Sequence, residues 1–203
     1  NRPFLTGREL GALSEAMQAG VLHGDGPATR ACQARFAERL GSVAALMTPS
    51  CSLALDLAML VSEIGPGDEV LIPDFTFVTT AQCVALRGAT PVFCDIRRDT
   101  PNLDEGRLQE ALTPRTKAII PLRYAGICSQ MDAIAEFARN SGLLVIEDAA
   151  QATGSMFGGR PAGTLGQMAA FSFHATKNVQ CGEGGMLVIN DNRFADAAHI
   201  AWE

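Results

Sequence analysis

Only two lysines occur in the 203 residues, at positions 117 and 177, against fourteen arginines. Lys177 lies in the stretch FSFHATKN (171–178), shortly before the glycine-rich stretch GEGG (182–185). Arginine keeps its proton at any working pH, whereas a desolvated lysine can lose one and form a Schiff base with an aldehyde. A lone lysine is most often an exposed charge, so Lys177 becomes a candidate nucleophile only through its neighbours.

An acidic pair follows the apolar run LLVI (143–146), which we expect to be a buried strand. Glu147 and Asp148 then fall at the carboxyl end of that strand, where ligands gather in open α/β sheets. Asp148 is equally suited to capping a helix, and a buried carboxylate needs a cationic or protonated partner. If the ligand is pyridoxal 5′-phosphate, Asp148 can keep its pyridine nitrogen protonated, so that the ring accepts electrons when a Cα–H bond breaks.

Two further stretches follow predicted strands. TPSCSL (48–53) begins a predicted helix, where free N–H groups and hydroxyls can bind a phosphate, although serine and threonine are also ordinary helix caps. FTF (75–77) could place an aromatic face over a planar ring, although core packing is the usual role of a single phenylalanine. With Asp148, Gln151 and Lys177, these stretches supply each role that a pyridoxal phosphate site requires.

The elements that must position these residues alternate along the chain. Short apolar runs predict strands at 44–47, 69–72, 91–95, 117–121, 143–147, 169–173 and 186–189. Amphipathic stretches predict helices at 52–64, 78–87, 103–112, 131–141 and 193–202. Nearly continuous apolar strands joined by helices indicate a three-layer α/β fold, with a mainly parallel seven-stranded sheet and helices on both faces.

Two helices precede this alternation. Thr6 and Glu9 form a capping-box pattern for a helix that ends at Gly20, and a second helix ends at Gly41. We expect residues 1–25 to be an N-terminal helical segment and residues 26–203 to be a cofactor-binding large domain. The last predicted helix has no stop signal, which indicates a fragment.

Composition excludes several classes of protein. Hydrophobic residues make up 47% and charged residues 19%, with a formal net charge of −6, so we expect a globular protein without a basic surface for nucleic acid. The apolar stretches fall far short of the about 20 residues that cross a bilayer, and no signal pattern opens the chain, so we predict a cytoplasmic protein without a membrane partner. The six cysteines are spaced singly, which favours reduced thiols and no metal site.

Four stretches carry a resemblance to a known family: PSCSLAL (49–55), PGDEVLIPDFTFVTTA (66–81), EDAAQATGS (147–155) and FSFHATKNVQCGEGG (171–185). From about Leu10 onward, the chain resembles the N-terminal part of a DegT/StrS-type sugar-nucleotide aminotransferase, a fold type I pyridoxal phosphate group. LRGA (86–89), RYAGICSQMD (123–132) and EDAAQ most resemble enzymes that aminate TDP-4-keto-6-deoxyglucose at C4. The resemblance implies that the family continues into a C-terminal small domain, which we expect to be absent from this sequence.

The resemblance implies a role for each candidate residue. Lys177 is expected to hold the cofactor covalently and then act as general acid and base, with Asp148 at the pyridine nitrogen and Gln151 near the ring hydroxyl. The remaining cofactor contacts are expected from Ser52, the backbone of Leu53, Ser172 and Phe77, with Phe75 as the reserve for stacking. The resemblance further implies that Arg123, where relatives often carry histidine, affects substrate or interface contacts.

The implied reaction is a transamination in a homodimer, in which glutamate supplies an amino group to a nucleotide-linked 4-keto-6-deoxy sugar. A sugar 3-dehydratase on the same scaffold is an alternative, but histidine replaces the lysine in those relatives, so Lys177 favours transamination. A non-catalytic or regulatory relative that keeps the fold is a second alternative. A plain nucleotide-binding domain lacks its signature, because neither G-x-G-x-x-G nor G-x-x-x-x-G-K-[ST] follows a strand.

Overall fold

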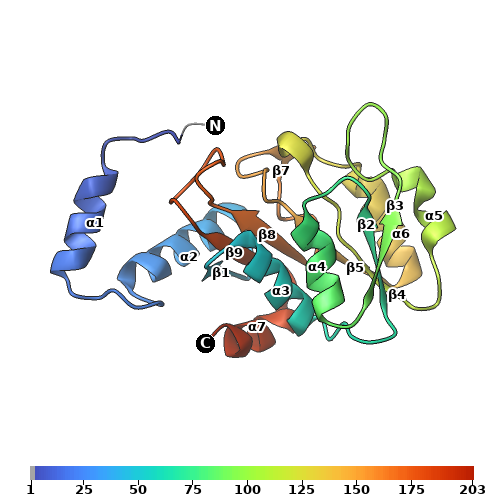
Figure 1. Cartoon of the computed structure of the whole chain (residues 1–203), viewed down its shortest axis with the longest axis horizontal. Helices are drawn as coiled ribbons and strands as arrows, with labels where there is room; N and C mark the ends of the chain where they lie inside the picture. The colour runs from blue at the N-terminus through green and yellow to red at the C-terminus, as the bar shows by residue number, and fades with distance from the viewer. Residues whose placement is uncertain (1–2) are drawn as a thin grey trace.

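The computed structural model describes residues 3–203, and its centre is a seven-stranded sheet in the order β1-β9-β8-β5-β4-β2-β3 (Figure 1). The strands are β1 (Ala44–Thr48), β2 (Glu69–Pro73), β3 (Thr90–Cys94), β4 (Thr116–Ile119), β5 (Leu144–Asp148), β8 (Met168–Ser172) and β9 (Gly185–Ile189). All seven predicted strands are therefore confirmed, with ends that differ by at most two residues. A separate hairpin of two-residue strands, β6 (Met156–Phe157) and β7 (Arg160–Pro161), was not predicted.

The sheet is mainly parallel, as predicted. β3, β2, β4, β5 and β8 pair in parallel, whereas β9 runs antiparallel to both of its neighbours, β8 and β1. Since β9 alone is reversed, the carboxyl ends of β1, β5 and β8 lie at one edge of the sheet. Thr48, Asp148 and Ser172 end these three strands, so the polar residues singled out in the sequence share that edge.

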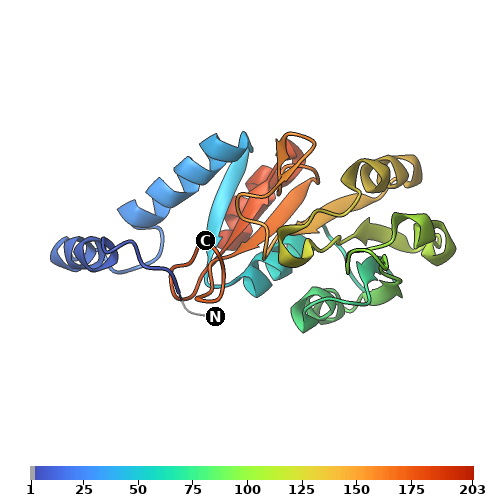
Figure 2. The ribbon, with the colours of Figure 1, turned by 90° about the horizontal axis from the view of Figure 1, so that it is seen from above.

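Helices cover both faces of the sheet, which confirms the predicted three layers (Figure 2). One face carries α3 (Cys51–Val61), α4 (Val78–Leu86) and α7 (Ala195–Trp202), and the other carries α2 (Pro27–Leu40), α5 (Leu108–Ala111) and α6 (Met131–Ser141). The side chains of successive strand residues point to opposite faces of the sheet. Ile146 packs in the core under α3, whereas Val145 packs in the core under α6. This alternation fixes which side chains of β5 meet which helices.

Two of the predicted helices start with a 3-10 turn. The helix expected at 103–112 consists of η1 (Glu105–Arg107) and the short α5, and the Asp104 side chain accepts a hydrogen bond from the Gly106 N–H at its start, 3.0 Å away. The helix expected at 193–202 begins with η3 (Asn192–Phe194) before α7. A third short 3-10 element, η2 (Tyr124–Gly126), lies beside the site described below.

The N-terminal helix α1 (Glu9–Gln18) forms, but none of its residues is buried, and Figure 1 shows it apart from the sheet. Only half of its predicted capping box is present: the Thr6 N–H and Oγ1 both donate to Glu9 Oε1 over 2.7 Å, but the N-cap residue is Arg8, which forms no side-chain cap hydrogen bond. These hydrogen bonds lower the pKa of Glu9 to about 2. The predicted division of the chain at residue 25 stays a prediction, and residues 1 and 2 of its first part lie outside the described residues.

Within residues 3–203, the helices are all too short or too polar to cross a membrane. The six cysteines are free thiols in the structure.

Candidate active site

A cavity of about 340 Å³ lies at the edge of the sheet where β1, β5 and β8 end. Six of the seven predicted site residues line it: Ser52, Phe77, Asp148, Gln151, Ser172 and Lys177. They come from the starts of α3 and α4, from the ends of β5 and β8, and from the loops that follow those two strands. The fold thus brings together residues that are up to 125 positions apart in the sequence, between 52 and 177.

The Asp148 carboxylate is held at both oxygens. Its side chain is buried, Thr80 Oγ1 donates to Oδ2 over 2.7 Å, and the Ala150 N–H donates to Oδ1 over 3.2 Å. Burial raises the pKa of Asp148, and the two hydrogen bonds together with the charge of Lys177 oppose that rise. Asp148 forms no ion pair with any arginine, lysine or histidine of residues 3–203. The carboxylate is therefore available to a cation supplied by a ligand.

Lys177 reaches the same cavity from the loop after β8 and is half-buried. The backbone N–H of Lys177 donates to the His174 carbonyl over 2.9 Å, so residues 174–177 form a tight turn. Next to it, Asn178 Nδ2 donates to the Thr153 carbonyl over 2.7 Å and ties this loop to the segment after β5. The loop that carries Lys177 is thus joined by a hydrogen bond to the segment that follows Asp148.

Gln151 is oriented by the neighbouring η2 turn. Its Oε1 accepts a hydrogen bond from the Ala125 N–H over 2.9 Å, so the carbonyl side of the amide faces the turn. The amide NH₂ is then the group of Gln151 that can donate to a ligand in the cavity. Ala125 adopts a left-handed conformation with φ of 52°, and Asn102 Oδ1 accepts from the adjacent Tyr124 N–H over 2.9 Å, which supports this strained turn.

The start of α3 sits directly against the sheet. A Cβ added at Gly185, the first residue of β9, would overlap the backbone of Ser50 and Cys51, so only glycine permits this close approach. Ser50 caps the helix, its Oγ accepting from the Leu53 N–H over 3.3 Å, while Ser52 lines the cavity. Leu53 is the one predicted site residue that does not line the cavity, and its N–H is already bonded to Ser50.

The two phenylalanines of the stretch 75–77 differ in environment. Phe77 is the N-cap residue of α4, is 67% exposed, and lines the cavity. The Phe75 ring instead packs edge-on against Tyr124, with 5.1 Å between the ring centroids. Phe77 is therefore the better placed of the two to cover a ligand.

Several cavity residues had no cofactor role assigned from the sequence, among them Thr79 and His174, whereas Ser50 and Cys51 lie in the stretch 48–53 that was singled out as a candidate phosphate site. The His174 Nδ1 accepts from the Thr176 N–H over 3.2 Å, and its Nε2 lies 3.7 Å from Glu183, another cavity residue. Burial raises the pKa of Cys51 well above its ordinary value, so this thiol is protonated near neutral pH. His174 and Glu183 lie in the two stretches that pointed to Lys177, whereas nothing in the helical pattern distinguished Thr79.

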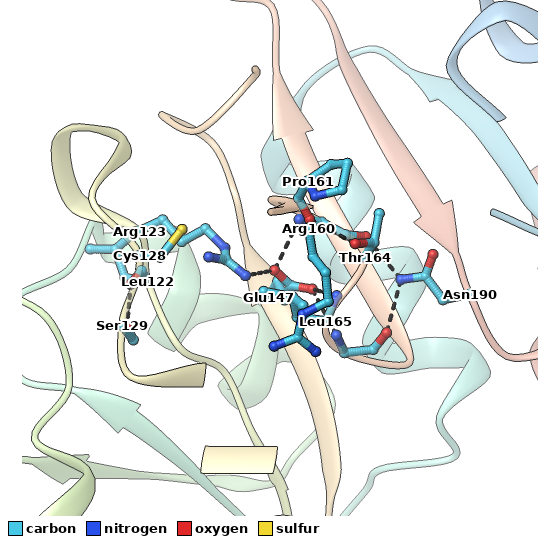
Figure 3. A network of polar contacts seen from close by, with 12 residues as sticks. Leu122, Arg123, Cys128, Ser129, Glu147, Arg160, Pro161, Thr164, Leu165 and Asn190 are labelled. Carbon is cyan, nitrogen blue, oxygen red and sulfur yellow. Dashed lines mark hydrogen bonds and ion pairs between the residues drawn. The ribbon is translucent and has the colours of Figure 1, made fainter. Parts of the chain in front are cut away.

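Arg123 is not one of the residues that line the cavity, and its expected effect on substrate or interface contacts stays a prediction. It is fully buried and forms an ion pair with Glu147, whose carboxylate also accepts hydrogen bonds from the N–H groups of Gly163, Leu165 and Gly166 (Figure 3). Asn190 Nδ2 donates to the carbonyls of this same 163–166 loop, at 2.9 and 2.8 Å. The Arg123 and Glu147 pair is thus an internal support of β5.

The cavity fits a planar, phosphorylated ligand with a protonated ring nitrogen. The buried Asp148 carboxylate forms no ion pair within residues 3–203, and the hydroxyls of Ser50, Ser52 and Ser172 line the cavity or cap α3 at its start. A helix start with free N–H groups favours a phosphate. Lys177 supplies an amine in the same space. Pyridoxal 5′-phosphate has each of the matching groups: an aldehyde, a pyridine nitrogen and a phosphate.

A sheet of this topology with this cavity defines the cofactor-binding domain of a pyridoxal phosphate-dependent enzyme. The chain belongs to the DegT/DnrJ/EryC1/StrS aminotransferase family, whose model matches residues 3–201. This finding confirms the resemblance that the sequence motifs carried.

Individual relatives agree with the family. The spore coat polysaccharide biosynthesis protein SpsC of Bacillus subtilis (strain 168) is 42% identical over 198 residues, which are 98% of this chain and 51% of SpsC. The structure of DesI in the presence of its TDP-sugar product matches 98% of this chain and 52% of DesI, with 35% identity and a TM-score of 0.87. The PLP form of Spr1654 from Streptococcus pneumoniae matches 99% of this chain and 55% of that protein, with 29% identity and a TM-score of 0.88.

Two consequences follow from these comparisons. The chain spans about half the length of the relatives it matches, as expected for the N-terminal part of such a protein. The prediction of pyridoxal 5′-phosphate as cofactor is confirmed for the family, since Spr1654 is known in both a PLP form and a PMP form.

Proposed function

We propose that the protein carries out a pyridoxal phosphate-dependent transamination, in which glutamate donates an amino group to a nucleotide-linked 4-keto-6-deoxy sugar. The single observation that carries this proposal is the shared cavity of Lys177 and Asp148, an amine and a buried carboxylate that forms no ion pair in the described part of the chain. The relatives support the choice of substrate class, because DesI has a TDP-sugar product and SpsC belongs to polysaccharide biosynthesis.

Each predicted residue has a distinct task in this proposal. Lys177 Nζ holds the cofactor covalently and afterwards takes up and returns the proton that is transferred, which requires it to be neutral for part of the cycle. Asp148 holds the proton on the ring nitrogen, and the Gln151 NH₂ donates to the ring hydroxyl. Bound pyridoxal phosphate supplies an electron sink for the breaking C–H bond.

The remaining residues bind rather than react. Ser52 and Ser172 donate to the phosphate, and the Leu53 N–H joins them by exchanging Ser50 Oγ for a phosphate oxygen. Phe77 covers one face of the ring and excludes water from it. We further propose a cytoplasmic homodimer, with neither nucleic acid nor membrane as partner, in keeping with the net charge of −6.

The alternatives lead to different experimental results. A sugar dehydratase would use a histidine where this chain has Lys177, so that residue favours transamination. A non-catalytic or regulatory relative would bind the cofactor but would not respond to glutamate. A spectroscopic experiment distinguishes the two remaining possibilities.

The two lysines form a matched pair for this experiment, because Lys117 is an exposed residue of β4. With added pyridoxal phosphate, we expect the intact protein and Lys117→Ala to develop a visible absorbance band that Lys177→Ala lacks. Added glutamate should bleach the band with release of 2-oxoglutarate. An equal band in Lys177→Ala contradicts the assignment of the lysine, and a band that glutamate leaves unchanged favours the non-catalytic relative.

A further inference from the structure

Two threonine hydroxyls form a chain that ends on the Asp148 carboxylate. Thr76 Oγ1 donates to Thr80 Oγ1 over 2.8 Å, and Thr80 Oγ1 donates to Asp148 Oδ2 over 2.7 Å. An ionised carboxylate can only accept, so the proton of Thr80 points toward Asp148, and the Thr80 oxygen is then free to accept from Thr76. Both hydrogen bonds therefore favour the charged form of the carboxylate.

Thr80 has little freedom to leave this position. It is fully buried in the first turn of α4, and its N–H donates to the Phe77 carbonyl over 3.0 Å. The same helical turn begins with Phe77, which lines the cavity. The first turn of α4 thus positions both Phe77, which lines the cavity, and the Thr80 hydroxyl, which donates to Asp148.

Among the residues that the structure describes, the ionisable groups around Asp148 form no ion pair with it. Three of these groups interact electrostatically with Asp148. They are Lys177 in the loop after β8, Cys51 at the start of α3, and Cys83 in α4. Burial raises the pKa of both thiols, that of Cys83 to about 12, so the thiols are neutral near pH 7. On the same strand, Glu147 is paired with Arg123 in a separate network.

We propose that Thr80, supported by Thr76, is a positioning residue that keeps the Asp148 carboxylate ionised and directed into the cavity. A neutral hydroxyl is suited to this task, because it stabilises the negative charge without adding a positive charge that would compete with a cationic ligand. The inference rests on the proposed function, in which that ligand is a protonated ring nitrogen.

The first test is a carbon-13 NMR titration of the Asp148 carboxyl group in the cofactor-free protein, with Asp148→Asn used to assign the signal. Thr80→Val keeps the shape of the side chain but removes the hydroxyl, and should raise the pKa of Asp148 by about one to two units. Thr80→Ser should restore the wild-type value. Thr116→Val, a buried threonine of β4 far from the site in the sheet, is the matched control and should leave Asp148 unchanged. The same Asp148 pKa in Thr80→Val as in the wild type overturns the proposal.

The second test measures the affinity for pyridoxal phosphate. We expect Thr80→Val to weaken it roughly tenfold or more, and Thr80→Ser to stay close to the wild type. Thr76→Val, at a half-buried position, should give a smaller rise of the Asp148 pKa. If Thr80→Val does not fold, the titration of Asp148 is done in Thr76→Val instead. An Asp148 pKa in Thr76→Val that equals the wild-type value overturns the proposal. A wild-type protein that binds no pyridoxal phosphate refutes the proposed function, whereas the cofactor-free titration still decides the role of Thr80.

Discussion

Glu147 and Asp148 are consecutive residues of β5 whose carboxylates lie on opposite faces of the sheet. Glu147 is enclosed by Arg123 and the N–H groups of the 163–166 loop, whereas Asp148 faces Thr80 and the cavity. The alternation of side chains along a strand produces this separation. One carboxylate is fully used to hold the strand in place, and the other stays available for a ligand.

The Arg123 and Glu147 pair makes a prediction about stability. Arg123→Met leaves a buried carboxylate with only its backbone donors and should lower the free energy of unfolding by about 3–5 kcal/mol. Glu147→Leu should cost more, because it also removes the acceptor of three N–H groups. Urea denaturation measures both. Arg30→Met, which breaks the exposed pair of Arg30 with Asp25, is the control and should change little; equal effects at positions 30 and 123 would contradict the buried role.

The buried carboxylate of Asp148 should destabilise the cofactor-free protein near neutral pH. Its folded pKa is raised by burial, so the cost of ionising it in the folded state is present in full above that pKa and disappears below the unfolded value of about 3.8. Asp148→Asn should therefore raise the melting temperature by a few degrees at pH 7, since about 1 kcal/mol corresponds to about 2–4 °C in a domain of this size. Thermal melts from pH 7 down to pH 3.5 check this. If the increase in melting temperature caused by Asp148→Asn grew as the pH falls, the pKa of Asp148 would not be raised in the folded protein.

Gly185 should be intolerant of any side chain. Gly185→Ala places a methyl group against the backbone of Ser50 and Cys51, so the first turn of α3 must move and the protein should lose about 1–3 kcal/mol. The affinity for pyridoxal phosphate should fall as well, because this turn forms the proposed phosphate site. Gly11→Ala, in open space on α1, is the matched control and should be neutral or slightly stabilising. Calorimetry measures the melting temperature and the affinity for pyridoxal phosphate of both variants. Values for Gly185→Ala that are comparable to those of Gly11→Ala would argue against the close approach of α3 to β9.

The serine hydroxyls should contribute to phosphate binding. Ser52→Ala and Ser172→Ala each remove a donor from the cavity and should weaken binding of pyridoxal phosphate about tenfold, the effect of one hydrogen bond to a charged group. Binding of pyridoxal, which lacks the phosphate, should change much less. Ser62→Ala, at the far end of α3, removes a hydroxyl that donates to the Ala58 carbonyl and serves as the control. A loss of affinity that is equal for both ligands would place the two serines elsewhere than at the phosphate.

The sequence predicted the sheet well because its strands are nearly continuous apolar runs with clear ends. It also predicted the residues that meet in the cavity, since Asp148 and Ser172 end strands and Lys177 follows one of them closely. Thr80 escaped notice because a threonine inside a helical pattern gives no sign of the strand it contacts, 68 positions away in the sequence.

The burial of Arg123 escaped notice for a related reason. Charged residues are rarely fully buried, and the sequence around Arg123 does not name a partner for its charge. The partner that permits its burial, Glu147, comes from the neighbouring strand, and only the paired register of β4 and β5 brings the two together. Short helices such as α5 were overestimated because periodicity does not reveal where a capping aspartate imposes a 3-10 turn.

The reversed direction of β9 has a consequence for the mobility of Lys177. Ser172 and Gly185 are paired residues of β8 and β9, so residues 173–184 form the loop of a β8–β9 hairpin. Both ends of this loop start at the edge of the sheet that borders the cavity. Backbone hydrogen bonds from Phe173 to Gly184 and from Ala175 to Gly182 continue the ladder into that tip. The backbone around Lys177 is thus held from both sides, so a backbone displacement at residue 177 would be passed to Ser172 at one end of the hairpin loop and to Gly185 at the other.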